Sequence, residues 1–246
     1  MPTIAFTTLG CRVNQYDTDS IRGLFFADGF TETDFNGRAD VYVINTCSVT
    51  HMGEKKSRQI IRRAKKNNAD GLVIVTGCYA QLSPDALAAI PDVDAVIGTN
   101  ERKNIVPVVN RLLSERTNVA VQAVHDVMGR DAFEEIPLYP SAVEHTRADL
   151  KIQEGCNNFC SYCIIPYTRG SLKSRRPDAV IAEAGRLAEA GFKEIVLTGI
   201  HLGAYGLDLP ERPTLALILK RLIEETDIER IRMGSVESAE IDDALI

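Results

Sequence analysis

The stretch EGCNNFCSYC places Cys156, Cys160 and Cys163 within eight residues of a 246-residue chain. Cysteines so close together often bind metal through their thiolates, and we call these three the clustered triad. A structural zinc site would need a fourth ligand, for which His145 and His201 are the candidates. A four-iron cluster held by three thiolates would instead keep one iron open for a substrate or cofactor. We favour the cluster, because three cysteines occur where a closed site needs four ligands.

The other three cysteines, Cys11, Cys47 and Cys78, share one context although they lie tens of residues apart; we call them the dispersed triad. They follow the stretches FTTLG, VINT and VIVTG, so each is expected just past the end of a parallel strand. Adjacent strands are about 4.8 Å apart, so these cysteines would converge at the sheet edge where such folds bind ligands. Three unrelated buried thiols are the alternative, since free cysteine is common in cores. We favour a second three-thiolate cluster.

Short apolar runs alternate with helical patterns in the first half of the chain. The runs are continuous and β-branched, as is typical of buried parallel strands, and cover residues 3–9, 41–46, 72–77 and 95–98. Helices are expected at residues 15–28, 54–66, 84–90 and 102–113. The alternation predicts an N-terminal α/β domain, residues 1–123, with an open parallel sheet and helices on its faces.

Residues 124–146 break this alternation, because they are polar and rich in proline, and they are predicted to be an inter-domain linker. A second alternation follows, with strands at 149–155, 194–199 and 230–235, helices at 177–190 and 214–226, and Ser238 as the cap of a further helix. Three βα repeats cannot close a barrel. Residues 147–246 are therefore predicted to be an incomplete (βα) barrel that lacks its C-terminal remainder.

The composition, 45 % hydrophobic and 25 % charged, is that of a globular protein. The sequence has neither a signal-peptide pattern nor an apolar run of about 20 residues, so a cytoplasmic protein with no membrane partner is expected. Cysteines in that compartment bind metal more often than they form disulfides.

The net charge of -6 argues against general binding of nucleic acid, but the segment EKKSRQIIRRAKK is locally basic. Lys55, Arg58, Arg62 and Lys65 repeat along one face of the expected helix and could bind RNA phosphates. A solvated helix face explains them equally well.

Two loops are expected on the same rim as the clustered triad. TGIHLGAYG contains Gly199, Gly203 and Gly206, and GSVES follows the next strand. Glycines there would let the backbone approach a ligand closely, although ordinary turn chemistry is the better explanation for glycines taken alone. Four polar residues are candidates for catalysis, although such residues often serve packing or solvation: Asp17, Asp19, Glu237 and His201.

The clustered triad resembles the signature of radical S-adenosylmethionine (SAM) enzymes, C-x3-C-x-(aromatic)-C, with Tyr162 at the aromatic position. The resemblance implies that the clustered triad holds a 4Fe-4S cluster whose open iron binds the amino and carboxylate groups of SAM. It also implies that the loop from Gly199 to Gly203 helps to hold the amino group. In this family the cofactor carries the radical chemistry and the protein orients it.

The whole chain resembles the methylthiotransferases of that family. The matching motifs are TLGCRVNQYDT, VINTCSVT, VTGCYAQ and GCNNFCSYCIIPYTRG, which ends in a Pro-Tyr-x-Arg-Gly segment. The most similar branch acts on N6-threonylcarbamoyladenosine in tRNA. The isopentenyladenosine branch usually has Gln-Met, and the ribosomal-protein branch Pro-Lys, where this chain has Arg12 and Val13.

The resemblance implies an enzyme that replaces the C2–H of this adenosine, beside the anticodon, with a methylthio group. The clustered triad would then hold the cluster that reduces SAM, the dispersed triad a second 4Fe-4S cluster that carries the sulfur, and a second SAM would give the methyl group. The implied partners are a tRNA anticodon stem-loop, near which Arg169 is expected to lie, and a low-potential electron donor. The alternatives are an enzyme for isopentenyladenosine tRNA or a ribosomal protein, and a non-catalytic zinc-bearing RNA-binding module.

Overall fold

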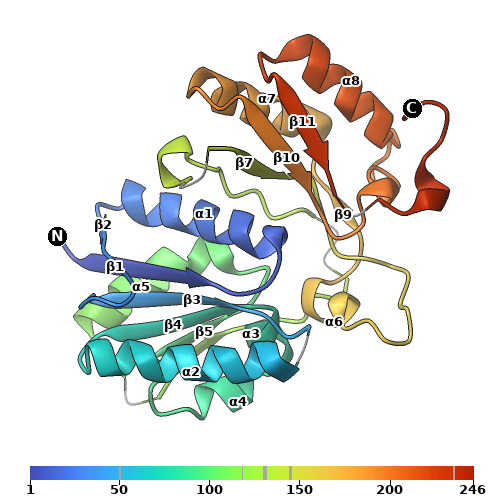
Figure 1. The fold of residues 1–246 in the computed structure, drawn as a ribbon. Coiled ribbons are helices and arrows are strands. Elements are labelled where there is room, and N and C mark those ends of the chain that lie inside the picture. The colour runs from blue at the N-terminus through green and yellow to red at the C-terminus, as the bar shows by residue number, and fades with distance from the viewer. Residues whose placement is uncertain (50, 118, 130–131, 144–145, 235) are drawn as a thin grey trace.

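The computed structural model describes residues 1–49, 51–117, 119–129, 132–143, 146–234 and 236–246. The chain forms two α/β parts, which lie one above the other in Figure 1. A six-stranded parallel sheet builds the N-terminal part, and a three-stranded parallel sheet builds the C-terminal part. The predicted fold class, an open α/β sheet followed by an incomplete (βα) barrel, is confirmed.

The N-terminal sheet places the strands that precede the dispersed triad side by side. Its order is β2-β1-β3-β4-β5-β6, so β1, β3 and β4 are neighbours. β3 and β4 are buried along their whole length, because helices cover both faces of the sheet. The strands are β1 (Thr3–Thr8), β2 (Thr31–Glu32), β3 (Val41–Thr46), β4 (Leu72–Gly77), β5 (Ala95–Ile97) and β6 (Val121–Ala123).

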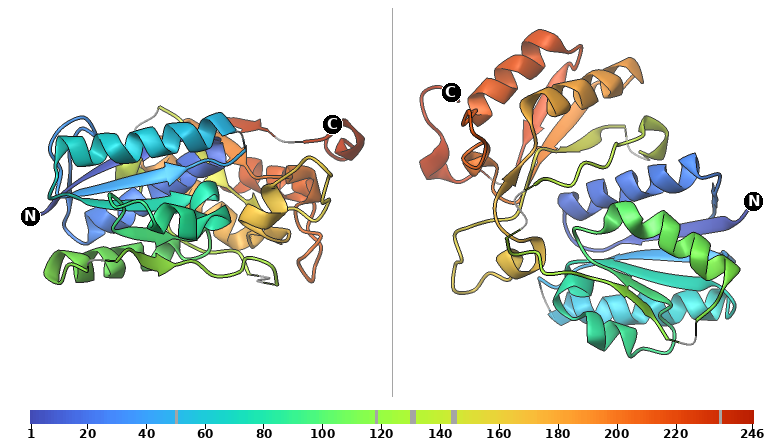
Figure 2. Two further views of the ribbon diagram at one scale, coloured as in Figure 1. Left: turned by 90° about the horizontal axis from the view of Figure 1, so that it is seen from below. Right: turned by 180° about the vertical axis from the view of Figure 1, so that it is seen from behind.

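Helices cover both faces of this sheet (Figure 2), and each face has its own apolar core. One core includes Phe25 of α1 and Val109 of α5, and the other includes Ile61 of α2 and Leu87 of α4. None of the helices among the described residues is long and apolar enough to span a bilayer. The helical elements of this part are α1 (Arg12–Ala27), α2 (His51–Asn67), α3 (Cys78–Leu82), α4 (Pro84–Ala88), the 3-10 turn η1 (Arg102–Asn104) and α5 (Ile105–Ser114).

The C-terminal sheet has the order β11-β10-β7, and α7 and α8 pack on one of its faces (Figure 1). The strands are β7 (Ala148–Lys151), β10 (Glu194–Thr198) and β11 (Arg230–Met233), with an antiparallel pair β8 (Gln153–Glu154) and β9 (Lys173–Ser174) beside them. The helical elements are η2 (Pro140–Ala142), α6 (Ile165–Arg169), α7 (Pro177–Glu189), η3 (Leu202–Ala204), α8 (Leu215–Glu225) and η4 (Ser238–Glu240).

The strand expected at residues 149–155 is split at Ile152. The Ile152 N–H donates to the Thr198 carbonyl of β10, whereas the Ile152 carbonyl accepts from Arg175 N–H beyond β9. The chain therefore leaves the parallel sheet here, and Cys156 follows β8 rather than β7. Ser238 is the first residue of η4 and not its cap; Glu237 caps this turn.

The segment expected to be a linker packs against both parts. Val127, Ile136 and Leu138 are buried, and a Cβ atom placed on Gly23 of α1 would lie 2.3 Å from the Tyr139 ring. The sequence did not predict this packing, because the apolar residues are separated by charged residues and prolines. The exact domain boundaries remain a prediction, but the described residues of this segment are not a free tether.

Buried charges join the two parts. Asp17 of α1 and Arg102 of η1 meet Lys151, Glu154 and Arg169, and all five side chains are at most 2 % exposed. The Lys151 Nζ–Asp17 Oδ1 distance is 2.5 Å, Arg169 Nη1–Asp17 Oδ2 is 2.6 Å and Arg102 Nη2–Glu154 Oε2 is 3.1 Å. Buried ions are tolerated only when they are paired, so this network, which we call the ionic junction, fixes how the parts meet.

Replacing Asp17 with Asn should destabilise the protein by about 3 kcal/mol, because three cations would then share one fewer buried anion. We expect a lower urea midpoint for Asp17→Asn. Asp70→Asn, which changes an exposed carboxyl group in the turn before β4, should shift stability by no more than about 0.5 kcal/mol. Equal midpoints for the two variants would show that the junction does not hold the parts together.

The carboxyl group of Asp17 should also make the stability of the protein sensitive to acid. Burial by itself would raise the pKa of Asp17, but Arg102, Lys151 and Arg169 outweigh it and hold the pKa below its ordinary value. A lowered folded-state pKa gives stability that is present above the unfolded pKa of about 4 and is lost as pH falls through the folded pKa. Stability measured between pH 6 and pH 3 should therefore fall less steeply in Asp17→Asn than in the wild type.

Candidate functional site

The dispersed triad lies at the carboxyl edge of the N-terminal sheet. Cys11 directly precedes α1, Cys47 follows β3, and Cys78 is the first residue of α3 after β4. A Cβ atom placed on Gly10 would lie 3.2 Å from the Cys47 sulfur, so the loop before Cys11 passes closely over Cys47. Burial raises the pKa of the Cys47 thiol, and Cys78 and Cys11 raise it further. The three thiols are thus close enough to interact.

Two asparagines tie the loops of the dispersed triad together. Asn14 Nδ2 donates to the Leu9 carbonyl at 2.7 Å and to the Thr46 carbonyl at 3.0 Å. Asn45 Nδ2 donates to the Asn14 carbonyl at 2.9 Å. These buried amides link the chain just before Cys11 and the first turn of α1 to the end of β3, because both donate to backbone carbonyls.

The turn that presents Cys78 requires glycine. Gly77 has φ +94° and ψ -168°, a conformation that is open essentially to glycine alone. A Cβ atom there would lie 2.3 Å from Asn45 Oδ1 and 2.4 Å from the Thr46 carbonyl oxygen. Only a residue without a side chain can therefore occupy this position between β4 and α3.

Arg169 connects the dispersed triad to the other part of the molecule. Its Nε donates to Cys78 Sγ at 3.3 Å, and its remaining nitrogens contact Asp17, Glu154 and Asn14. Its side chain is fully buried. The guanidinium is enclosed by protein groups and lies against a cysteine, so Arg169 presents no surface to RNA here, and its place near a substrate or cofactor stays a prediction.

The clustered triad lines a cavity of about 410 Å³ together with Tyr162 and His201. Cys156 Sγ lies 3.8 Å from His201 Nδ1, and the Cys163 N–H donates to the Cys160 carbonyl at 2.8 Å. Tyr162 is 89 % exposed, so its ring stands at the mouth of the loop and not in the core.

The glycines of the loop after β10 make room for two side chains that the sequence analysis missed. Gln153 Oε1 accepts hydrogen bonds from the N–H groups of Ile200 and His201 at 2.8 and 2.7 Å, and a Cβ atom on Gly199 would lie 2.9 Å from it. A Cβ atom on Gly203 would lie 1.9 Å from Glu240 Oε2, while Glu240 Oε1 contacts His201 Nε2. Neither Gln153 nor Glu240 stands in a motif that could have revealed it.

A second cavity, of about 600 Å³, lies between the two triads. It is bordered by Cys11 on one side and by Thr198 and Gly199 at the carboxyl end of β10 on the other. It shares Ile165 and Ile200 with the cavity of the clustered triad, so the two spaces adjoin. We call it the central cavity; the clustered triad and Cys11 of the dispersed triad border the recess that the two cavities form.

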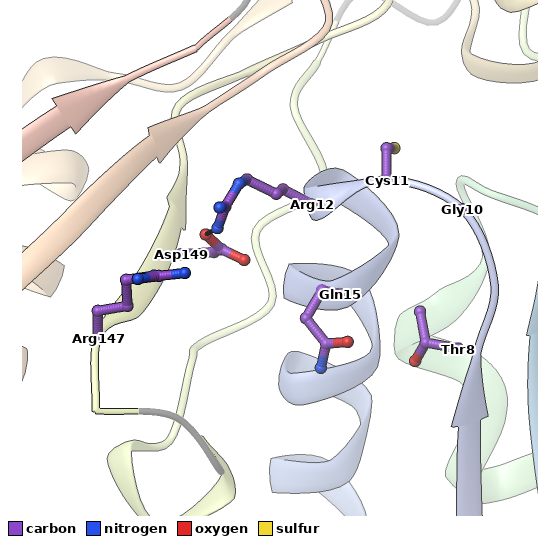
Figure 3. Close-up of a pocket in the computed structure, with 7 residues that line it drawn as sticks. All are labelled: Thr8, Gly10, Cys11, Arg12, Gln15, Arg147 and Asp149. Atoms are coloured by element: carbon purple, nitrogen blue, oxygen red, sulfur yellow. Dashed lines mark hydrogen bonds and ion pairs between the residues drawn. The ribbon is translucent and has the colours of Figure 1, made fainter.

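A smaller polar pocket, of about 270 Å³, adjoins Cys11 on the side of β7 (Figure 3). Its lining includes Thr8, Gln15, Arg147 and Asp149. Arg12 Nη1 donates to Asp149 Oδ1 at 3.1 Å, and the picture shows this side chain reaching from the start of α1 towards β7.

The donor sets fit iron–sulfur clusters better than single zinc ions. Among the described residues, no three histidine, cysteine, aspartate or glutamate side chains converge as a one-ion site would require. A four-iron cluster takes one thiolate on each of several irons, and soft sulfur donors suit it. His145, one proposed fourth zinc ligand, lies outside the described residues; His201, the other, contacts Glu240 through Nε2 and faces Cys156 with Nδ1.

The remaining predicted residues fall into different surroundings. Lys55 and Arg62 of α2 are exposed, whereas Arg58 Nη1 donates to the Tyr79 hydroxyl at 2.7 Å and Lys65 pairs with Asp94 at 3.1 Å. The basic face is thus partly used for packing. Of the catalytic candidates, Asp17 lies in the ionic junction and Asp19 pairs with Arg22, while Glu237 and His201 line the cavity of the clustered triad.

The C-terminal part has the fold of radical SAM proteins. Residues 150–240 match the family described as "Radical SAM superfamily". A solved radical S-adenosylmethionine methyltransferase, TsrM of Kitasatospora setae, has TM-score 0.66 and 14 % identity over 99 % of this chain and 57 % of its own. Residues 3–98 match "Uncharacterized protein family UPF0004".

Similarity to curated proteins is more specific than these family matches. "Threonylcarbamoyladenosine tRNA methylthiotransferase MtaB" is 48 % identical in Bacillus subtilis and 40 % in Aquifex aeolicus, over 100 % and 99 % of this chain and 54 % and 58 % of those proteins. "tRNA-2-methylthio-N(6)-dimethylallyladenosine synthase" of Syntrophomonas wolfei is 35 % identical over 97 % of this chain and 54 % of its own. The chain thus combines a match to the radical SAM superfamily with similarity to these methylthiotransferases along its whole length, and it spans about half the length of these relatives.

Replacing Gly77 with Ala should disrupt the dispersed triad. The clash with Asn45 and Thr46 adds to the backbone strain, so we expect a loss of about 3 kcal/mol or more in urea unfolding. Gly129→Ala is the matched control, since Gly129 also has positive φ, +76°, but no described atom lies within 4 Å of a Cβ there. It should cost only about 1–2 kcal/mol. A Gly77→Ala variant as stable as Gly129→Ala would contradict the tight turn before Cys78.

Proposed function

We propose that this chain acts in a radical SAM methylthiotransferase that places a methylthio group on C2 of N6-threonylcarbamoyladenosine, next to the anticodon of tRNA. The observation that carries the proposal is that the three cysteines of the clustered triad and Cys11 of the dispersed triad border adjoining cavities. Two relatives named for threonylcarbamoyladenosine are 48 and 40 % identical, against 35 % for the dimethylallyladenosine relative, and this supports the proposed substrate.

In this proposal each triad holds a 4Fe-4S cluster, and S-adenosylmethionine binds beside the clustered triad. When bound, these groups would supply the radical that activates the C2–H bond and the sulfur that replaces the hydrogen. The backbone of Gly199 and Gly203, shaped by Gln153 and Glu240, would hold the amino acid end of S-adenosylmethionine, and Tyr162 would stand at the mouth of this loop.

The chain's own residues have defined tasks in this scheme. Arg169 orients Cys78 through the contact between its Nε and Cys78 Sγ, and Asn14 and Asn45 hold the neighbouring loops. The apolar lining of the central cavity would pack against the reacting base and limit its exposure to solvent.

The proposed partners are a tRNA anticodon stem-loop and a low-potential electron donor, in the cytoplasm, where such a substrate is found. The exposed Lys55 and Arg62 are the proposed phosphate contacts, and they lie on the helix that begins four residues after Cys47. Arg58 and Lys65, which have partners inside the protein, would contribute through their charge alone.

Replacing one cysteine in each triad should separate two activities in the full-length protein. Cys47→Ala removes a ligand of the dispersed triad, so S-adenosylmethionine should still be cleaved to 5′-deoxyadenosine while no methylthio product forms. Cys160→Ala should abolish both. The measurements are anaerobic turnover with a chemical reductant, followed by mass spectrometry of 5′-deoxyadenosine and of tRNA nucleosides.

The iron content of each variant is the control for this experiment. Each variant should lose about one cluster and keep its fold. Equal loss of cleavage in both variants, each with one intact cluster, would refute the division of labour between the triads. A colourless wild-type protein that contains zinc and no iron would overturn the enzyme itself and favour a metal-bearing RNA-binding module. Methylthio product on isopentenyladenosine tRNA or on a ribosomal protein would keep the chemistry and change the substrate.

A further inference from the structure

The central cavity combines apolar walls with positive charge. The residues that form its apolar lining are Val13, Val49, Ile165, Val196, Leu197, Ile200 and Met233. Within the described part of the chain, the only charged side chains that line it are Arg12 and Arg232. Such a cavity suits a ligand with a flat or aliphatic body and one anionic arm, because arginine pairs with carboxylates in a planar, two-pronged geometry.

Arg12 is better placed than Arg232 to bind the anionic part of a ligand. It follows Cys11 directly, lines both the central cavity and the polar pocket of Figure 3, and its side chain is 52 % exposed. The contact with Asp149 uses one of the five N–H donors of its guanidinium, which leaves an edge for a second acceptor.

Arg232 faces the same space from the other part. Asp149, Val196 and Arg232 are register partners across β7, β10 and β11, so Arg232 stands two strands, about 10 Å, from Asp149. Its Nε donates to Glu194 at 2.6 Å, and its side chain is 53 % exposed. The two arginines therefore border the cavity from opposite sides of Val196.

The chemistry of the proposed substrate supplies the anionic arm. A threonylcarbamoyl group is threonine joined through its nitrogen and a carbonyl to the base, and it ends in a carboxylate. A dimethylallyl group on the same nitrogen is an uncharged hydrocarbon. We infer that Arg12, assisted by Arg232, binds this carboxylate and selects the threonylcarbamoyl substrate. The inference rests on the proposed function and names the specificity-determining residue of the same site.

The Arg12–Asp149 pair could otherwise be only a latch between α1 and β7. A latch would affect acidic and neutral substrates equally, whereas a carboxylate contact would affect only the acidic one. The test therefore varies the protein and the ligand together. The probes are an anticodon stem-loop RNA with threonylcarbamoyladenosine and the same RNA in which the threonine carboxylate is a methyl amide.

Binding is measured by fluorescence anisotropy with the full-length holoenzyme under anaerobic conditions, and KM and kcat are measured in parallel. The wild type should bind the acid about tenfold more tightly than the amide. Arg12→Gln keeps a hydrogen-bond donor for Asp149 but removes the charge, so this preference should disappear through weaker binding of the acid. Arg12→Lys should keep part of it.

Arg232→Gln and Arg230→Gln form a matched pair on one strand. Both arginines contact Glu194, and Arg230 is 64 % exposed, but only Arg232 lines the central cavity. Arg232→Gln should reduce the acid preference in part, and Arg230→Gln should leave it unchanged.

Different results would contradict the role of Arg12 and the proposed function. A wild-type enzyme that forms methylthio product with equal KM for acid and amide would overturn this inference and leave the proposed function standing. Arg12→Gln that weakens both ligands equally would reduce the residue to a latch and also overturn it. Failure of the wild type to modify or bind either RNA would instead count against the proposed function.

Discussion

Five buried charges set the geometry on which the rest of this molecule depends. Asp17 and Arg102 come from the N-terminal part, and Lys151, Glu154 and Arg169 come from the C-terminal part. None of them can remain buried unless the others are in place, because an unpaired ion in the protein interior costs several kcal/mol. The pairing therefore favours this arrangement of the two parts, in which the clustered triad and Cys11 of the dispersed triad border adjoining cavities.

Neither part forms the central cavity alone. Cys11 and Val49 belong to the first part, whereas Ile165, Ile200 and the carboxyl ends of β10 and β11 belong to the second. The reactive groups that both parts carry are therefore brought to one place by packing rather than by sequence proximity. The two family matches fall on the two parts that form this cavity, residues 3–98 on the open sheet and residues 150–240 on the βα sheet.

The sequence predicts the strands well where burial dictates residue type. β3 and β4 are continuous apolar runs, and their bounds agree with the expected residues 41–46 and 72–77. The ionic junction could not be foreseen, because Asp17 and Arg169 are 152 residues apart and charged residues usually indicate surface. The burial of Arg169 was not predicted for that reason. Gln153 and Glu240 were not predicted, because single polar residues form no periodic pattern in the sequence.

The contact between Arg169 and Cys78 has a consequence for the order of events during synthesis. A chain emerges from the ribosome N-terminus first, and the N-terminal sheet has all its strands before the second part is made. Arg169 follows Cys78 by 91 residues, so a nascent chain presents the dispersed triad for a time without the cation that covers it. During this interval the thiol is open to oxidants and to stray metal ions, and the arrival of the second part ends that vulnerability.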